Sequence, residues 1–158
     1  MASFLYTHYK KAALSGAVNL LSNTVKVMLV NSTYSPQVDA SSETTHAVTG
    51  DIKAYEVAAG GGYAPGGLEL TSRSLTQDNV DKEGVFDAAD AVWSSSTITA
   101  SGAVVYISGG SSYPANGNTA GNIGQSYLVA FVDFGGNQSS SNGTFQISWN
   151  SEGIINFT

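Results

Sequence analysis

The two histidines, His8 and His46, are the side chains of this chain best suited to acid–base chemistry near neutral pH. His8 lies in an apolar stretch with helical spacing, and His46 lies in a polar linker. A Ser-His-Asp triad needs a histidine that is oriented by a carboxylate and touches a serine. The G-x-S-x-G sequence that exposes such a serine does not occur. We therefore expect no catalytic residue, and we expect that the protein is not an enzyme.

Three aspartates are the best candidates for metal ligands. Asp87 and Asp90 are close in sequence, and Asp133 lies on another predicted strand. Carboxylate oxygens are the ligands that Ca²⁺ prefers, but the D-x-[DN]-x-[DN]-G loop is missing. Solvation of turns and strand edges explains these aspartates better, so we expect no metal ion and no cofactor.

Glycines cluster at Gly60-Gly61-Gly62 and again at Gly66-Gly67. Loops that cradle phosphate lie between a strand and a helix and usually carry a lysine. Here the glycines flank Tyr63-Ala64-Pro65 and lead into a predicted strand. The pattern therefore predicts a structural turn, in which glycine supplies left-handed backbone positions.

Aromatic rings beside polar groups could bind a glycan. Trp149 alternates with Phe145 and Ile147 and is predicted to be core, whereas Trp93 fits either role. Tyrosine is favoured where one end of a side chain is buried and the other is wet. The better candidates for exposed contacts are the tyrosines of predicted loops: Tyr34, Tyr63 and Tyr113.

The composition limits the partners. Only 11% of the residues are charged, the formal net charge is −6, and the six basic residues are dispersed apart from Lys10-Lys11. Neutralising phosphates requires clustered Lys and Arg, so we expect no nucleic acid. No apolar run approaches the roughly 20 residues that span a bilayer, and the first residues lack the order of a signal peptide. We expect no membrane contact and a protein made in a cytoplasm.

Helical spacing marks the first 14 residues. Leu5, Tyr9 and either Ala12 or Ala13 share one helix face, Ser3 is a plausible N-cap, and Gly16 is a plausible stop. A helix this short needs a partner surface. We therefore assign residues 1–16 to an N-terminal helix or arm.

The remaining chain, residues 17–158, has strand patterns. Strands are predicted at 25–31, 68–76, 85–93, 97–108 and 126–134, followed by a β-hairpin around 145–157. The predicted linkers 32–53, 109–125 and 135–143 are rich in Ser, Gly, Asn and Thr. The pattern predicts an all-β fold, a jelly-roll-like β-sandwich, with a barrel as the alternative.

Several motifs occur together along the chain. They are carried by four segments: ALSGAVNLLSNTVKVMLVNSTYSP, AYEVAAGGGYAPGGLELTSRSL, VFDAADAVWSSSTITASGAVVYI and LVAFVDFGGNQSSSNGTFQISWNSEGIINFT. The motifs in these segments include Glu56-Val57 before Gly62-Tyr63, the Gly66-Gly67 turn and Tyr106. In this order the segments resemble small virion proteins of tailed bacteriophages.

The resemblance implies a capsid cement or head-decoration protein on the virion surface, bound to the major capsid protein and assembled as a homotrimer. Some members of this group are labelled head-fibre or tail proteins, so a tail structural protein stays an alternative. A glycan-binding module for host attachment is another.

The large side chains of the N-terminal segment are the predicted contacts with another subunit or with the capsid, because large aromatic residues carry much of the energy at interfaces. They are Phe4, Leu5, Tyr6 and Tyr9. The alternative is that these side chains pack on the domain of their own chain.

Overall fold

The computed structural model describes residues 4–36, 52–108 and 127–157. Ser3, His46 and Tyr113 lie outside these ranges, as do the predicted linker 109–125 and most of the linker 32–53.

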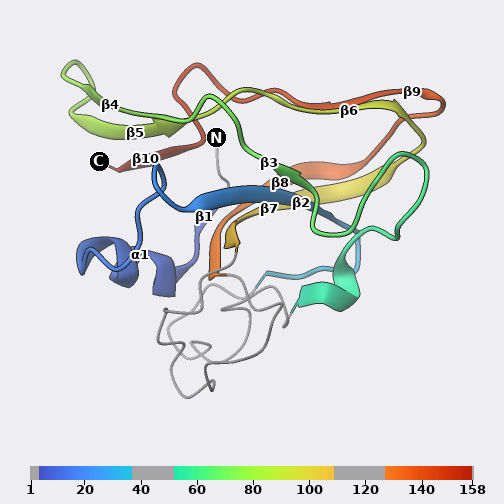
Figure 1. Ribbon diagram of the computed structural model, residues 1–158, viewed down its shortest axis with the longest axis horizontal. Helices are drawn as coiled ribbons and strands as arrows, with labels where there is room; N and C mark the ends of the chain where they lie inside the picture. Colours follow the sequence, from blue (N-terminus) through green and yellow to red (C-terminus); the bar gives the residue numbers. More distant parts are fainter. Residues whose placement is uncertain (1–3, 37–51, 109–126, 158) are drawn as a thin grey trace.

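Two layers of antiparallel strands face each other in the described residues (Figure 1). One layer is a five-stranded sheet in the order β1-β8-β7-β2-β3, with strands Phe4–Leu5, Tyr127–Ser139, Thr99–Ser108, Thr24–Val30 and Leu68–Glu69. The other layer contains the sheet β10-β5-β4, with strands Ile155–Phe157, Glu83–Asp87 and Ser74–Asp78, and the pair β6-β9, with strands Ala91–Ser96 and Gly143–Ile147. The predicted all-β fold with a short N-terminal helix is confirmed.

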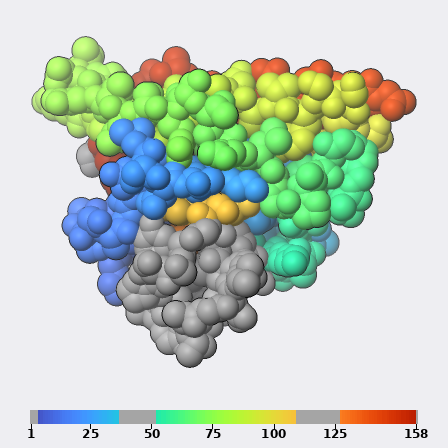
Figure 2. Space-filling model, viewed as in Figure 1, coloured from blue at the N-terminus to red at the C-terminus, as the bar shows by residue number. Residues whose placement is uncertain are grey.

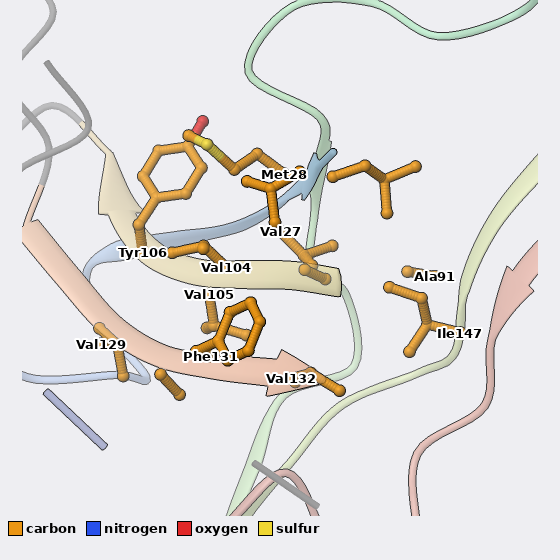
Figure 3. Close-up of a cluster of buried hydrophobic side chains, with 14 of the residues drawn as sticks. Val27, Met28, Ala91, Val104, Val105, Tyr106, Val129, Phe131, Val132 and Ile147 are labelled. Atoms are coloured by element: carbon orange, nitrogen blue, oxygen red, sulfur yellow. The ribbon is translucent and has the colours of Figure 1, made fainter. Parts of the chain in front are cut away.

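The core lies around β2, β7 and β8. Successive residues at 27–30, 103–107 and 128–132 are buried, so both faces of the central sheet are covered at these positions. This explains why the three strands read as nearly continuous apolar runs. Figure 3 shows that Ala91 and Ile147, which belong to the pair β6-β9, face this cluster. They contribute to the core from the second layer.

The N-terminal segment differs from the prediction of one helix over residues 1–14. Phe4 and Leu5 form β1 and pair with Phe131 and Ala130 of β8. The helix α1 spans only Thr7–Leu14, and its N-cap, Tyr6, makes no capping hydrogen bond with its side chain. Pairing with the edge of β8 satisfies backbone groups that a first helical turn would leave without partners.

The end of α1 agrees with the prediction. Gly16 has a φ of 71°, and its N–H donates to the Ala13 carbonyl at 3.1 Å. The Ala17 N–H donates to the Ala12 carbonyl at 3.0 Å. These two bonds form a Schellman motif, for which glycine is favoured.

Two predicted strands are divided because the chain passes from one sheet to another. The segment 68–76 splits into β3 and β4, and the segment 85–93 splits into β5 and β6. Between them the Ala89 N–H donates to the Thr71 carbonyl at 2.9 Å, which joins the two crossing segments. The alternation of apolar and polar residues indicates which side of a strand is buried, but not which sheet the strand joins.

The end of the chain also departs from the prediction. The linker predicted at 135–143 is largely strand, because β8 continues to Ser139. The predicted turn at Asn150–Gly153 is present, closed by a 2.8 Å bond from the Gly153 N–H to the Asn150 carbonyl. The hairpin prediction is wrong, however, because β10 pairs with β5 and not with β9. Ile154 and Ile155 become buried in this arrangement.

Candidate interaction surface

The four side chains predicted as interface contacts lie in two environments. Tyr6 and Tyr9 are buried in the core of their own chain, as the alternative interpretation expects. The Tyr6 hydroxyl hydrogen-bonds to that of Tyr34, and burial raises the pKa of Tyr6 well above its usual range. Phe4 and Leu5 are half-buried at the edge of the five-stranded sheet. Of the four side chains, only Phe4 and Leu5 therefore have exposed surface that another molecule could contact.

His8 connects the N-terminal segment to β8. Its Nε2 lies 2.9 Å from the Leu128 carbonyl and carries the proton there, because a carbonyl oxygen only accepts. The Tyr127 hydroxyl donates to the His8 carbonyl at 2.8 Å, and the two rings pack edge to face with centroids 4.8 Å apart. These contacts give His8 a structural role.

The motif residues around the glycines converge on one polar network. The backbone of Glu56 bridges to Val30 at the end of β2, after a short 3-10 helix, η2, at Lys53–Tyr55. This places its carboxylate against the Gly66 N–H and the Tyr63 hydroxyl, which donates at 2.8 Å. The Tyr106 hydroxyl donates to the Gly66 carbonyl at 2.6 Å. The network holds a turn in place, as the glycine pattern predicts.

The aspartates singled out from the sequence do not come together in the described residues. Asp90 accepts bonds from the Trp149 N–H at 3.0 Å and from Gln146 Nε2 at 2.7 Å. The first of these bonds is the main reason why its pKa is lowered. Three other carboxylates have oxygens within 4.8 Å of one another: Asp78, which is half-buried, and the exposed Asp81 and Glu152.

The tyrosines that the sequence offers for glycan binding are less exposed than predicted. Tyr34 and Tyr63 are buried, which overturns their prediction as exposed contacts, and Trp93 is buried as well. Each lies in a loop or strand that folds back over the core, a result that local sequence does not reveal. Trp149 is half-buried against the core, and its Nε1 donates to the Ala89 carbonyl at 3.0 Å.

Four of the large apolar side chains that are exposed belong to α1, the β4-β5 hairpin and β10, and these elements lie at one end of the molecule (Figure 1). Leu14 is 89% exposed, Val80 86%, Leu75 60% and Phe157 41%. The rings of Tyr9 and Phe157 have centroids 6.4 Å apart and connect α1 with β10. We call these four residues the apolar end. Figure 2 shows the hairpin, in light green, projecting from the body here.

Sequence reasoning missed the apolar end. Leu75 was part of a predicted strand, and Val80 follows a polar run from Thr76 to Asn79. An apolar residue between polar neighbours is a weak signal, since single exposed apolar residues are common. A contact surface is indicated only when such residues come together in the fold, and spacing along the chain does not reveal that.

No protein-family model, curated protein or solved structure matches this chain. Within the ranges that the structure describes, no helix has the length and apolar character needed to cross a membrane.

Proposed function

We propose that this protein is a capsid cement, or head-decoration, protein of a tailed bacteriophage. In this role it binds the major capsid protein at the virion surface and stabilises the assembled head. The structural observation that supports the proposal is the apolar end, because a surface with several large exposed apolar side chains is suited to binding another protein. The resemblance of the sequence to small virion proteins supplies the identity of the partner.

The low charge of the chain supports the same role. With 11% charged residues, attachment must rest mainly on apolar and hydroxyl contacts. A protein that binds only the assembled shell stabilises that shell by mass action, as a ligand stabilises the state it binds. A rigid sandwich with an apolar end can do this without a catalytic site.

We further propose a homotrimer, on the basis of the resemblance. Several weak sites that act together gain affinity through effective concentration. Light scattering should then give a mass of about three times the 16.3 kDa of one chain. A monomer at micromolar concentration, both free and on the shell, would contradict the trimer.

The decisive experiment compares phage particles with and without the protein in a thermal-release assay of packaged DNA. Particles that lack the protein should form shells but release DNA at a lower temperature. Adding back the purified protein should restore the release temperature. Equal release temperatures with and without the protein would overturn the proposal.

Two variants test whether the apolar end is the contact. Leu75→Ser combined with Val80→Ser should abolish the add-back effect, because both side chains are largely exposed and not needed by the core. The matched control is Val92→Ser on β6, which is 41% exposed but lies away from the apolar end. If the control loses the effect as fully as the double variant, the apolar end is not the contact.

A further inference from the structure

A small hollow of about 220 Å³ lies where the second half of β8 passes β9. It is lined by two phenylalanines, two glutamines and one serine: Phe134, Gln138, Ser139, Phe145 and Gln146. None of these side chains is charged. Ligand sites of drug size measure about 300–1,000 Å³, so this hollow suits a single ring.

The hydrogen-bonding groups of the hollow are partly committed. Gln146 Nε2 donates to Asp90 Oδ2 at 2.7 Å and lies 2.9 Å from Ser148 Oγ. A carboxamide has two N–H groups, so these contacts orient Gln146 and leave its Oε1 as an acceptor. Within the described residues, the exposed carboxamide of Gln138 makes no hydrogen bond, so it offers a donor and an acceptor.

The aromatic wall is held rigidly. The half-buried ring of Phe134 has its centroid 6.1 Å from that of the buried Phe145, at an interplanar angle of 50°. Phe145 in turn packs edge to face on Trp93, with centroids 6.0 Å apart. The part of Phe134 that lines the hollow is therefore a fixed apolar surface beside two carboxamides.

We infer that this hollow binds a neutral saccharide through one sugar ring. The ring hydroxyls exchange hydrogen bonds with Gln138 and with Oε1 of Gln146, and the C–H face of the sugar lies on Phe134. An anionic ligand would find no positive charge among the five lining side chains and would meet the carboxylate of Asp90 beside Gln146. An apolar ligand would cover the carboxamides without replacing their bonds to water. The inference is independent of the proposed function, because it concerns the isolated chain.

The test is NMR on the full-length chain with four neutral probes: glucose, galactose, mannose and N-acetylglucosamine. At least one probe should show saturation transfer from the protein and should shift the side-chain amide signals of Gln138 and Gln146. The Kd should be on the order of 1 mM, because one sugar ring has few atoms from which to gain affinity.

Two variants connect binding to the hollow. Gln138→Ala and Phe134→Leu should each weaken the binding of that probe about tenfold, a change equivalent to about 1.4 kcal/mol. Their matched controls are Gln77→Ala and Phe157→Leu, which change an exposed Gln and a partly exposed Phe on β4 and β10. Both controls should bind as the parent does. Thermal unfolding of each variant separates lost binding from lost folding, and Phe134→Tyr, which keeps the ring, should retain binding.

Three results would overturn the inference. The first is no saturation transfer from any probe at about 20 mM, well above the expected Kd. The second is an equal loss of binding in the control variants. The third is that the neutral peptide Gly-Ser-Gly shifts the same amide signals more strongly than every sugar, which would assign the hollow to a peptide.

Discussion

The phenol of Tyr63 donates a 2.8 Å hydrogen bond to the carboxylate of Glu56. The same phenol oxygen accepts the Leu29 N–H at 3.1 Å. One side chain from the glycine-rich turn thus satisfies a buried backbone group of β2 and holds a carboxylate beside the turn. Burial is the main cause that raises the pKa of Tyr63, and the nearby Glu56 raises it as well.

Replacing Tyr63 with Phe should destabilise the protein by about 1–3 kcal/mol, because the buried Leu29 N–H loses its partner. Urea denaturation followed by circular dichroism measures this change. The control is Tyr9→Phe: the Tyr9 ring is buried, but its hydroxyl makes no hydrogen bond within the described residues. Equal losses in the two variants would mean that the hydrogen bonds of Tyr63 contribute nothing specific.

Gly67→Ala should cost more than about 2 kcal/mol. Gly67 has a φ of 66°, and an added Cβ would lie 1.8 Å from the Val27 carbonyl oxygen. Gly16→Ala separates the two causes: its φ is similar, at 71°, but nothing lies within 4 Å of the added Cβ. Gly16→Ala should therefore cost only the left-handed backbone conformation, about 1–2 kcal/mol. Unfolding midpoints that fall equally in both variants would exclude a clash at Gly67.

Stability should fall at alkaline pH. Burial raises the pKa of Tyr106 to about 12, whereas a tyrosine in the unfolded chain ionises near about pH 10. The folded state keeps a proton that the unfolded state loses, so this contribution is complete below about pH 10 and is lost as the pH rises through about 12. Urea midpoints between about pH 8 and about pH 11 should decrease, and less steeply in Tyr106→Phe. A parallel decrease in parent and variant would count against Tyr106 as a source.

Deleting residues 1–14 should prevent stable folding. Tyr6 and Tyr9 are buried, and truncating a large buried aromatic side chain costs about 3–5 kcal/mol, against a total stability of about 5–15 kcal/mol for a typical domain. Proton NMR of the truncated chain should show poor dispersion. The control Leu14→Ser, at a site that is 89% exposed, should fold normally. A well-dispersed spectrum of the truncated chain would show that residues 15–158 fold without the N-terminal segment.

Attachment to the shell should depend only weakly on salt. Screening weakens interactions between exposed charges. Carboxylates do lie near Val80, at Asp78, Asp81 and Glu152, but the proposed contact itself consists of apolar side chains. Raising NaCl from about 50 mM to about 500 mM should change the Kd less than about tenfold, which sedimentation of shells with bound protein can measure. Release of the protein at moderate salt would show that the contact is electrostatic.

Local sequence alone determined the apolar strands and some of the turns. The continuous apolar runs of β2, β7 and β8 fit only a position covered on both faces, and Gly16 and Gly153 occupy turns that need a left-handed residue. These features depend on neighbours along the chain. The class of fold could therefore be predicted without any knowledge of which strands pair.

Only the tertiary structure decided which sheet each strand joins and which side chains reach the surface. The sequence of β10 is compatible with pairing to β9, yet the turn at Asn150–Gly153 directs it to β5. Tyr6 and Tyr9 are of the aromatic type that is common at interfaces, yet both are buried in their own chain. Leu75, in contrast, lies on an edge strand and is exposed. Strand pairing joins segments that are far apart in the chain, and burial depends on what covers a residue from another layer. Neither is encoded in the spacing of neighbouring residues.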